Sequence, residues 1–371
     1  MQLSKNTKWV LTTVTLFLFA IWITLLDLQI IGSTYLVSII RLSSIYALIG
    51  VSMNLVNGFT GQFSLGQAGF MAIGAYVVGM LSTNPENRSA IYYVTPISSL
   101  IEDVYLPFFP ALILGGVLAA LLALLIGAPV LRLKSDYLAI ATLGFSEIIR
   151  VCISNNHLAP FTNGSLGLKN IPSFAALWRH MGLPGNGLWI CVGLVGLCIT
   201  LMMMMIRSSY GRAFLAIREN EIAAQAMGIN LASHKLMSFA TGAFFAAIGG
   251  GLLAVHLTAI DPNQFKIALT YELLLIVVLG GLGSVTGTVI GAFAITIGKE
   301  LLRFADSPVY IGSYAIPIFR SGFRMVIFSL LLMIIVLFYN RGIMGTKEFS
   351  WDGLANLITK PFRKKTSREV K

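Results

Sequence analysis

The chain has 371 residues, of which 56% are hydrophobic and only 11% are charged, and its mean hydropathy is +0.83. Soluble domains carry about a quarter charged residues, so a chain of this composition cannot cover a water-facing surface and is predicted to be an integral membrane protein. The formal net charge of +11 does not indicate a nucleic-acid partner, because the basic residues lie in loops and at the C-terminal tail, as the cytoplasmic bias of positive charge in membrane proteins would place them.

Apolar runs recur along the chain, and each is long enough to cross a hydrocarbon core of roughly 30 Å as a helix. The alternating pattern of barrel strands is absent, so the sequence predicts an all-α, polytopic transmembrane helix bundle. The first run is too long for a signal-peptide core and has no small-residue cleavage site, so we interpret it as a retained helix. The predicted membrane segments are 9–26, 34–56, 65–82, 108–131, 137–154, 188–206, 236–257, 271–297 (interrupted) and 323–339.

The number of crossings conflicts with the charge distribution. Nine full crossings would leave the termini on opposite sides, yet both termini are basic and both are expected in the cytoplasm. The segment 279–292, LGGLGSVTGTVIGA, contains five glycines. Each glycine costs about 1 kcal/mol relative to alanine inside a helix, so this segment predicts a break. A re-entrant pair or two short crossings in place of one helix would give about 9–10 membrane segments in total and leave both termini on the same side of the membrane.

A second glycine-rich interruption lies at 56–76, VNGFTGQFSLGQAGFMAIGAY. Two broken segments in corresponding halves of a membrane protein indicate a transporter pathway. Positive half-helix ends could contact the carboxylate of a zwitterionic solute, and open carbonyls its ammonium group. Close helix packing is the alternative role for each glycine. The residues predicted to line or shape the pathway are Gly58, Gly61, Ser64, Gly66, Gly280, Gly281, Gly283 and Ser284.

The segment 207–230, RSSYGRAFLAIRENEIAAQAMGIN, is a polar, helix-like stretch between two apolar runs. Acidic Glu219 and Glu221 favour a helix N-terminus, and Gly228 suits a helix end. Ala223 and Ala224 form a low surface that fits a groove. The pattern predicts a cytoplasmic coupling helix, within a coupling segment 207–235, that docks on a separate motor subunit; an amphipathic helix on the membrane surface is the alternative.

Chemistry-bearing residues are few. The chain has no G-x-x-x-x-G-K-[ST] motif, so ATP and Mg are expected on partner subunits and no cofactor on this chain. Its three cysteines, Cys152, Cys191 and Cys198, have no metal-ligand spacing, so neither a metal site nor a catalytic residue is predicted. Glu147 and Arg150 share a helix face, and we interpret them as an intramembrane ion pair rather than a gate or a substrate-facing pair.

Four blocks of this chain resemble the permeases of branched-chain amino acid ABC transporters, in the order that the family has. They are NLVNGFTGQFSLGQAGFMAIGAY, LRLKSDYLAIATLGFSEIIRV (followed by NNHLAPFTNGSLGLKNIP), RENEIAAQAMGIN and LIVVLGGLGSVTGTVIGA. The second block is similar to the LivM-type subunit, and the third resembles the coupling segment called the EAA region, with Ile222 before the alanine pair. The resemblance implies coupling roles for Arg218, Glu219, Glu221, Ala223, Ala224 and Gly228.

The resemblance implies a permease subunit, not an enzyme, in an ATP-driven ABC importer for leucine, isoleucine, valine or related amino acids. The implied partners are a second, LivH-type permease, two cytoplasmic ATPase subunits, a periplasmic or lipid-anchored amino-acid-binding protein and the lipid bilayer. The implied location is the bacterial inner membrane, with both termini cytoplasmic. Residues 1–350 are expected to form one permease domain and 351–371 a basic tail. A urea or short-amide permease of the same group and an ion-coupled secondary amino acid carrier remain alternatives.

Overall fold

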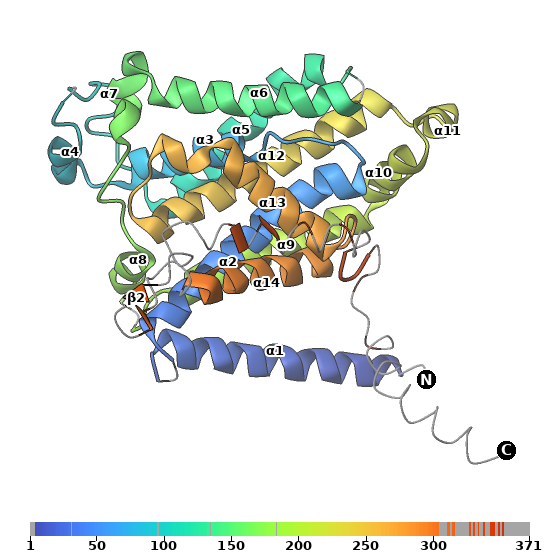
Figure 1. Ribbon diagram of the computed structural model, residues 1–371, viewed down its shortest axis with the longest axis horizontal. Helices are drawn as coiled ribbons and strands as arrows, with labels where there is room; N and C mark the ends of the chain where they lie inside the picture. Colours follow the sequence, from blue (N-terminus) through green and yellow to red (C-terminus); the bar gives the residue numbers. More distant parts are fainter. Residues whose placement is uncertain are drawn as a thin grey trace.

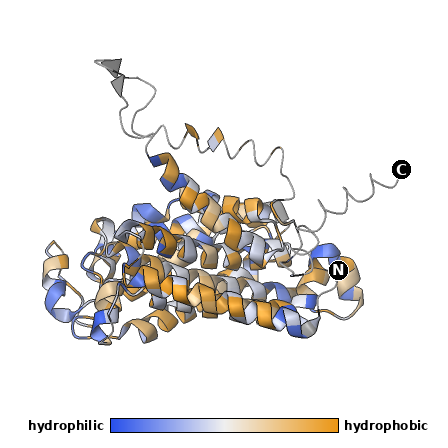
Figure 2. Ribbon diagram, turned by 90° about the horizontal axis from the view of Figure 1, so that it is seen from below, coloured by the Kyte–Doolittle hydropathy of each residue, from blue (hydrophilic) through white to orange (hydrophobic). Residues whose placement is uncertain are grey.

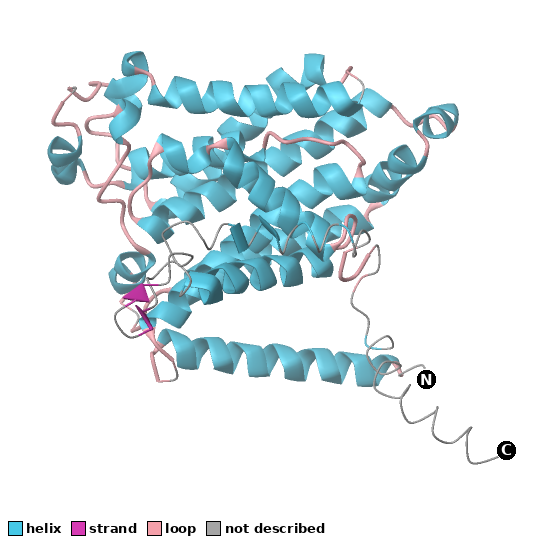
Figure 3. Ribbon diagram, viewed as in Figure 1, coloured by secondary structure: helices cyan, strands magenta, loops and turns pink. Residues whose placement is uncertain are grey.

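The computed structural model describes residues 4–303, apart from 31, 95, 134 and 183, and then 310–311, 314–315, 326–327, 329–330, 333, 337, 342–345, 348 and 351. Helices make up almost all of the regular structure in these residues (Figure 3). The strands among them are two antiparallel pieces of two residues each, β1 (Tyr310–Ile311) and β2 (Tyr314–Ala315), with Tyr310 opposite Ala315. The all-α prediction is therefore confirmed.

Six described helices are long and apolar enough to cross a membrane. They are α1 (Lys5–Asp27), α2 (Thr34–Asn54) with its π-helical extension η1 (Leu55–Phe59), α5 (Phe108–Val130), α6 (Ser135–Ser154), α9 (Leu188–Arg207) and α12 (Leu231–Leu257). Three shorter apolar helices accompany them: α3 (Gln67–Ser82), α13 (Ile267–Gly280) and α14 (Val285–Leu301). Each corresponds to a predicted segment or to half of the interrupted one. The predicted segment 323–339 lies largely outside the described residues.

The helices cross from one end of the bundle to the other (Figure 1). One end, here named the α11 end, carries α10 (Ser209–Glu219) and α11 (Glu221–Ala226). The opposite end, here named the loop end, carries the short helices α4 (Pro85–Ile91), η2 (Asn156–Leu158), α7 (Ala159–Thr162), η3 (Gly164–Leu166), α8 (Phe174–His180) and η4 (Pro262–Phe265). Polar residues gather toward the two ends and apolar residues cover the middle (Figure 2), as expected of a membrane-spanning bundle.

The interrupted segment folds as two short antiparallel crossings rather than as one helix. α13 runs toward the α11 end and α14 runs back to the loop end (Figure 1). Asp27 Oδ1 accepts a hydrogen bond from Leu188 N at 2.8 Å, which joins the end of α1 to the start of α9 at the loop end. The N-terminal end of α1 therefore lies at the α11 end. Ile343 N donates to Leu279 O at 2.8 Å, so the chain is again at the α11 end by residue 343.

Helix α12 forms the centre of the bundle. In an apolar stretch of 18 residues of α12, 89% of the residues are buried, whereas only 11% are buried in the corresponding stretch of α1. α12 crosses α3 at main-chain contact. A Cβ atom at Gly74 would overlap the carbonyl oxygen of Ala247, and one at Gly250 would overlap that of Met71. Small residues permit this approach, and close packing is a main source of helix association in membranes.

Candidate functional site

The first break begins where α2 changes pitch at η1, and the chain then runs without helical structure over residues 61–66. Its polar groups find partners within the protein. Asn57 Nδ2 donates to Ser64 O, and Ser64 N donates to Asn57 Oδ1, both at 3.1 Å. Thr142 Oγ1 of α6 accepts from Leu65 N at 3.0 Å. The predicted pathway residue Ser64 is buried inside this network, so the polar groups of the irregular backbone are satisfied within the protein.

The second break separates α13 from α14 over residues 281–284. Gly281 and Gly283 adopt φ angles of +118° and +89°, a region that glycine enters without steric strain. The carbonyl oxygen of Gly280, at the end of α13, accepts a hydrogen bond from Met344 N at 3.2 Å. Residues from the far C-terminal part of the chain therefore complete this break.

The amides at the start of α14 are also bonded within the protein. Ser284 caps the helix, with its Oγ accepting from Gly287 N at 3.1 Å. The Glu348 carboxylate accepts from Val285 N at 2.6 Å and from Thr286 N at 3.0 Å. A solute carboxylate could reach these amides only if Glu348 moved away. The hypothesis that half-helix ends bind the solute stays a prediction with that added condition.

Asn54, fully buried at the end of α2, connects the two breaks. Its Nδ2 donates to Thr288 Oγ1 (2.6 Å), to Ser284 O (2.9 Å) and more weakly to Gly281 O (3.3 Å). Its Oδ1 accepts from Gly283 N at 2.9 Å. The Asn54 amide thus uses both its NH₂ group and its oxygen in hydrogen bonds to the second break. The end of α2 and the α13–α14 turn therefore form one polar unit.

Arg218, at the end of α10, reaches both breaks. Its Nη1 donates to the carbonyl oxygen of Gly58 at 2.8 Å. A Cβ atom at Gly283 would come within 2.6 Å of the same Nη1, and one at Gly61 would lie 3.1 Å from Arg218 Cγ. A Cβ at Gly58 would come within 2.5 Å of Gly283 N. The structure therefore brings the predicted coupling segment and both predicted pathway segments together at one point.

Packing accounts for the remaining pathway glycines. A Cβ atom at Gly66 would lie 3.3 Å from the carbonyl oxygen of Thr142, and one at Gly280 would lie 2.5 Å from that of Gly287. A Cβ at Gly281 would overlap the carbonyl oxygen of Gly345. These contacts favour the packing role for the three glycines, and a direct role in contacting solute stays a prediction.

The coupling segment is two helices rather than one. Asn220 has extended backbone angles (φ −160°, ψ 109°) and caps α11, so the helix axis bends there. Glu221 lies in the first turn of α11, as predicted, whereas Glu219 is the last residue of α10 rather than part of a helix start. Lys235 Nζ of α12 pairs with Glu221 Oε1 at 2.7 Å. Gly228 follows the helix with φ +84°, which confirms its predicted position at a helix end.

The alanine pair of α11 divides between the two faces of the helix. Ala224 is only 4% exposed and faces the protein, whereas Ala223 is exposed. Ile222 and Met227 are 82% and 83% exposed, the highest values among the large apolar side chains that the structure describes. The exposed apolar side chains here are therefore Ile222 and Ala223 of α11 and Met227 directly after it, with Ala224 on the buried side of the helix.

The predicted ion pair forms on α6, in the half of the helix nearer the loop end. Arg150 Nε donates to Glu147 Oε1 at 2.9 Å, and Nη2 contacts the same oxygen. The Glu147 side chain is 36% exposed and that of Arg150 is 17% exposed, so the pair lies at the surface of this chain rather than inside it. The intramembrane position of the pair stays a prediction, and a gate or a substrate-facing pair stays the alternative.

The sequence analysis did not single out two residues whose side chains hold the second break, Asn54 and Glu348. Asn54 is an uncharged polar residue at the end of an apolar run, immediately before the first break, and that position was a usable signal. Glu348 lies 63 residues from the amide that it caps, and no local pattern marks it.

The model of one protein family, described as "Branched-chain amino acid transport system / permease component", matches residues 35–337. The chain belongs to this family. The matched residues run from the second residue of α2 through α14 and contain both breaks, α10 and α11. No solved structure matches the chain.

Individual relatives separate two permease types within the family. The chain is 33% identical over 311 residues to the high-affinity branched-chain amino acid permease LivM of Escherichia coli strain K12, covering 78% of this chain and 68% of that protein. It is 27% identical to a probable LivM of Methanocaldococcus jannaschii, covering 86% and 94%. Identity to LivH of Salmonella typhimurium is 25%, covering 83% and 94%. The family member described here is thus of the LivM type.

Proposed function

We propose that this permease forms, with a LivH-type second permease, the translocation pathway of an ATP-driven importer for leucine, isoleucine, valine or related amino acids. Two ATPase subunits dock at the α11 end, which faces the cytoplasm, and a solute-binding protein delivers the amino acid to the loop end in the periplasm. The names of the LivM and LivH relatives support the solute class and the second permease. The exposed apolar side chains of Ile222, Ala223 and Met227 support ATPase docking at this end.

The hydrogen bond from Arg218 to Gly58 is the observation that carries this proposal. An ATPase that moves α11 also moves α10, because the two helices are separated only by Asn220. Arg218 passes this movement to the first break directly and to the second break through its contact with Gly283. Both breaks interrupt helices that cross the bundle, so a shift there can change how the halves of those helices line a pathway.

Uptake and co-purification test the proposal. Cells with and without the gene are given labelled leucine, isoleucine, valine, alanine and urea. We expect gene-dependent uptake of the branched-chain amino acids, and a tagged chain that co-purifies with two soluble ATPases and a second permease. Accumulation of solute by vesicles holding only this chain, driven by a sodium or pH gradient without nucleotide, would refute the proposal. Gene-dependent uptake of urea alone would refute the solute assignment.

An Arg218→Ala variant tests the coupling step. Hydrogen bonds to a charged group contribute about 1.5–3 kcal/mol, so losing this one should lower uptake at least about tenfold. We expect the complex to continue to hydrolyse ATP. The matched control is Arg212→Ala, because Arg212 is exposed and its Nη2 bonds only to Ser209 Oγ within its own helix (2.9 Å). Equal uptake by both variants would contradict the role given to Arg218.

A further inference from the structure

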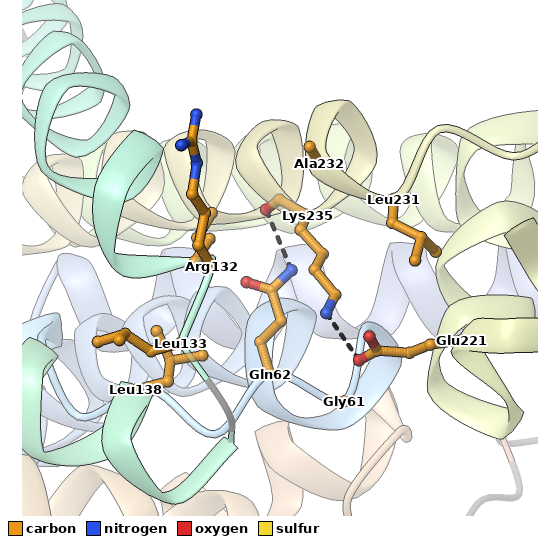
Figure 4. A pocket seen from close by; sticks show the side chains of 10 residues that line it. Gly61, Gln62, Arg132, Leu133, Leu138, Glu221, Leu231, Ala232 and Lys235 are labelled. Carbon is orange, nitrogen blue, oxygen red and sulfur yellow. Dashed lines mark hydrogen bonds and ion pairs between the residues drawn. The ribbon is translucent and has the colours of Figure 1, made fainter.

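A cavity of about 480 Å³ lies at the α11 end and has no part in the coupling contact described above (Figure 4). Five pieces of chain border it: the first break, the turn between α5 and α6, the first turn of α6, α11 and the start of α12. Its size is within the range of sites for small molecules, roughly 300–1,000 Å³. The cavity is therefore large enough for a metabolite and is bordered by elements that belong to the proposed coupling route.

Gln62 provides an unsatisfied acceptor in this cavity. The residue is 4% exposed, and its Nε2 donates to the carbonyl oxygen of Lys235 at 3.1 Å. Its Oε1 has no hydrogen-bond donor among the residues that the structure describes. The Lys235 ammonium donates to Glu221 Oε1 and forms no hydrogen bond with Gln62 Oε1. Figure 4 shows the amide oxygen directed away from that ion pair, toward Leu133 and Leu138. Buried acceptors in native proteins are normally satisfied, so this oxygen calls for a donor from a ligand.

The rest of the lining adds a cation and an apolar wall. Arg132 is exposed at the rim and forms no ion pair with any side chain that the structure describes. Leu131, Leu133 and Leu138 border the same space. A ligand that matches all three features has a protonated amine for Gln62 Oε1, a carboxylate for Arg132 and an aliphatic group for the leucines. A free aliphatic α-amino acid has these three groups on neighbouring atoms.

We propose that this cavity binds a free aliphatic α-amino acid from the cytoplasm and that its occupancy slows the import cycle. The proposal rests on the proposed function for the side of the membrane that the α11 end faces. The cavity is bordered by Glu221 of α11, Lys235 of α12 and Gly61 of the first break, and a Cβ at Gly61 would lie 3.1 Å from Arg218 Cγ. A ligand seated among these elements stabilises their present arrangement, because binding favours the conformation that it fits. Accumulated product would in this way lower its own import.

Reconstituted vesicles provide the test. The complete importer is placed in vesicles with ATP inside and the solute-binding protein with labelled leucine outside. The initial uptake rate is measured with increasing unlabelled L-leucine inside, and each variant is compared with its own empty vesicles. We expect loaded wild-type vesicles to import at least about fivefold more slowly than empty ones. We expect 4-methylpentanoate, which lacks the amine, and 3-methylbutylamine, which lacks the carboxylate, to need concentrations about tenfold higher for the same effect.

Two variants address the cavity in different ways. Arg132→Gln removes the cation, and Ala232→Trp fills the cavity without removing a polar group; each should raise the inhibitory leucine concentration at least about tenfold. Arg212→Gln is the matched control, because it removes the same charge at the same end outside the cavity, and it should behave as wild type. Equilibrium dialysis of labelled leucine against the purified permease complex, without binding protein, should show the same order of affinities.

Each alternative outcome is decisive. The inference is overturned if internal leucine leaves wild-type uptake unchanged, or if Arg132→Gln and Ala232→Trp respond as wild type. It is also overturned if inorganic phosphate inhibits at the same concentration as leucine, because that result would indicate a simple anion site. Absence of leucine uptake by empty wild-type vesicles would be a failure of the proposed function and is recognised separately.

Discussion

Asn54→Ala removes the side chain that joins α2 to the second break, and its cost can be worked out from the contacts. Ser284 O keeps other donors, Thr288 N (3.2 Å) and Thr288 Oγ1 (2.8 Å). Gly283 N, in contrast, loses its acceptor inside the protein. An orphaned buried donor costs roughly 1–3 kcal/mol, and interhelical hydrogen bonds in membranes average about 0.6 kcal/mol each. The free energy of unfolding should therefore fall by about 3 kcal/mol.

The assay is unfolding by SDS titration in mixed micelles, followed by circular dichroism. Ser52→Ala serves as the control, because Ser52 is equally buried but its Oγ donates only to Ile49 O of its own helix (2.7 Å). We expect less than about 1 kcal/mol for this variant. If Asn54→Ala and Ser52→Ala lower the free energy of unfolding by the same amount, the reasoning that assigns Asn54 a bridging role is wrong.

Three further predictions follow from single contacts. Gly283→Leu should abolish uptake while leaving membrane insertion intact, because its Cβ would approach Arg218 Nη1 within 2.6 Å at a φ of +89°. Gly144→Leu is the control and should keep uptake, because a Cβ at Gly144 would meet nothing within 4 Å outside the backbone of its own helix. Labelled-leucine uptake and immunoblots of membranes measure both variants. A cysteine at Ile222 should cross-link to the ATPase in intact membranes at least about fivefold faster than one at Ala224, because Ile222 is 82% exposed and Ala224 only 4%. Arg88→Met should speed proteolysis of the loop 83–107, because the buried Arg88 guanidinium donates to the carbonyl oxygens of residues 102 and 104 at 2.8 and 2.6 Å. Limited chymotrypsin digestion of right-side-out and inside-out vesicles measures it, because the loop contains tyrosines and leucines, and Arg88 is its only trypsin site.

Results that contradict these predictions are equally specific. Normal uptake by the Gly283 variant would remove the argument that Arg218 needs the space beside it. Equal cross-linking at both α11 positions would mean that the helix docks with a different face. Unchanged digestion of the Arg88 variant would show that other contacts hold the loop.

The sequence predicted the helices and breaks well because both depend on local properties. A run of apolar residues specifies a membrane-crossing helix by its length, and clustered glycines weaken a helix wherever they occur. The break at 279–292 was therefore located from composition. Two basic termini, both expected on the cytoplasmic side, were enough to predict an even number of crossings. Neither argument needed to know which helices are neighbours.

The contacts that make the site were not predictable in the same way. Asn54 bonds to residues about 230 positions away, and Arg218 to one 160 positions away. Their partners are backbone groups, which carry no sequence signal. The orientation of Ala224 depends on the bend at Asn220, and a single continuous helix over 207–230 would have placed the alanines differently. Periodicity fixes the face of a helix only when the helix is unbroken.

The crossing of α3 and α12 has a consequence for motion. At Gly74 and Gly250 the two backbones are in direct contact, so at these two points no side chain can change rotamer and absorb a displacement, although Phe70 and Phe239 pack between the helices farther along. Packed interfaces of this kind resist gradual deformation. The two helices must travel as one piece during a transport cycle, and any rearrangement has to occur at their boundaries with α2, α6 and α13. Opening toward either side of the membrane would then be a rotation of this piece, with residues 61–66, which lead directly into α3, serving as its pivot.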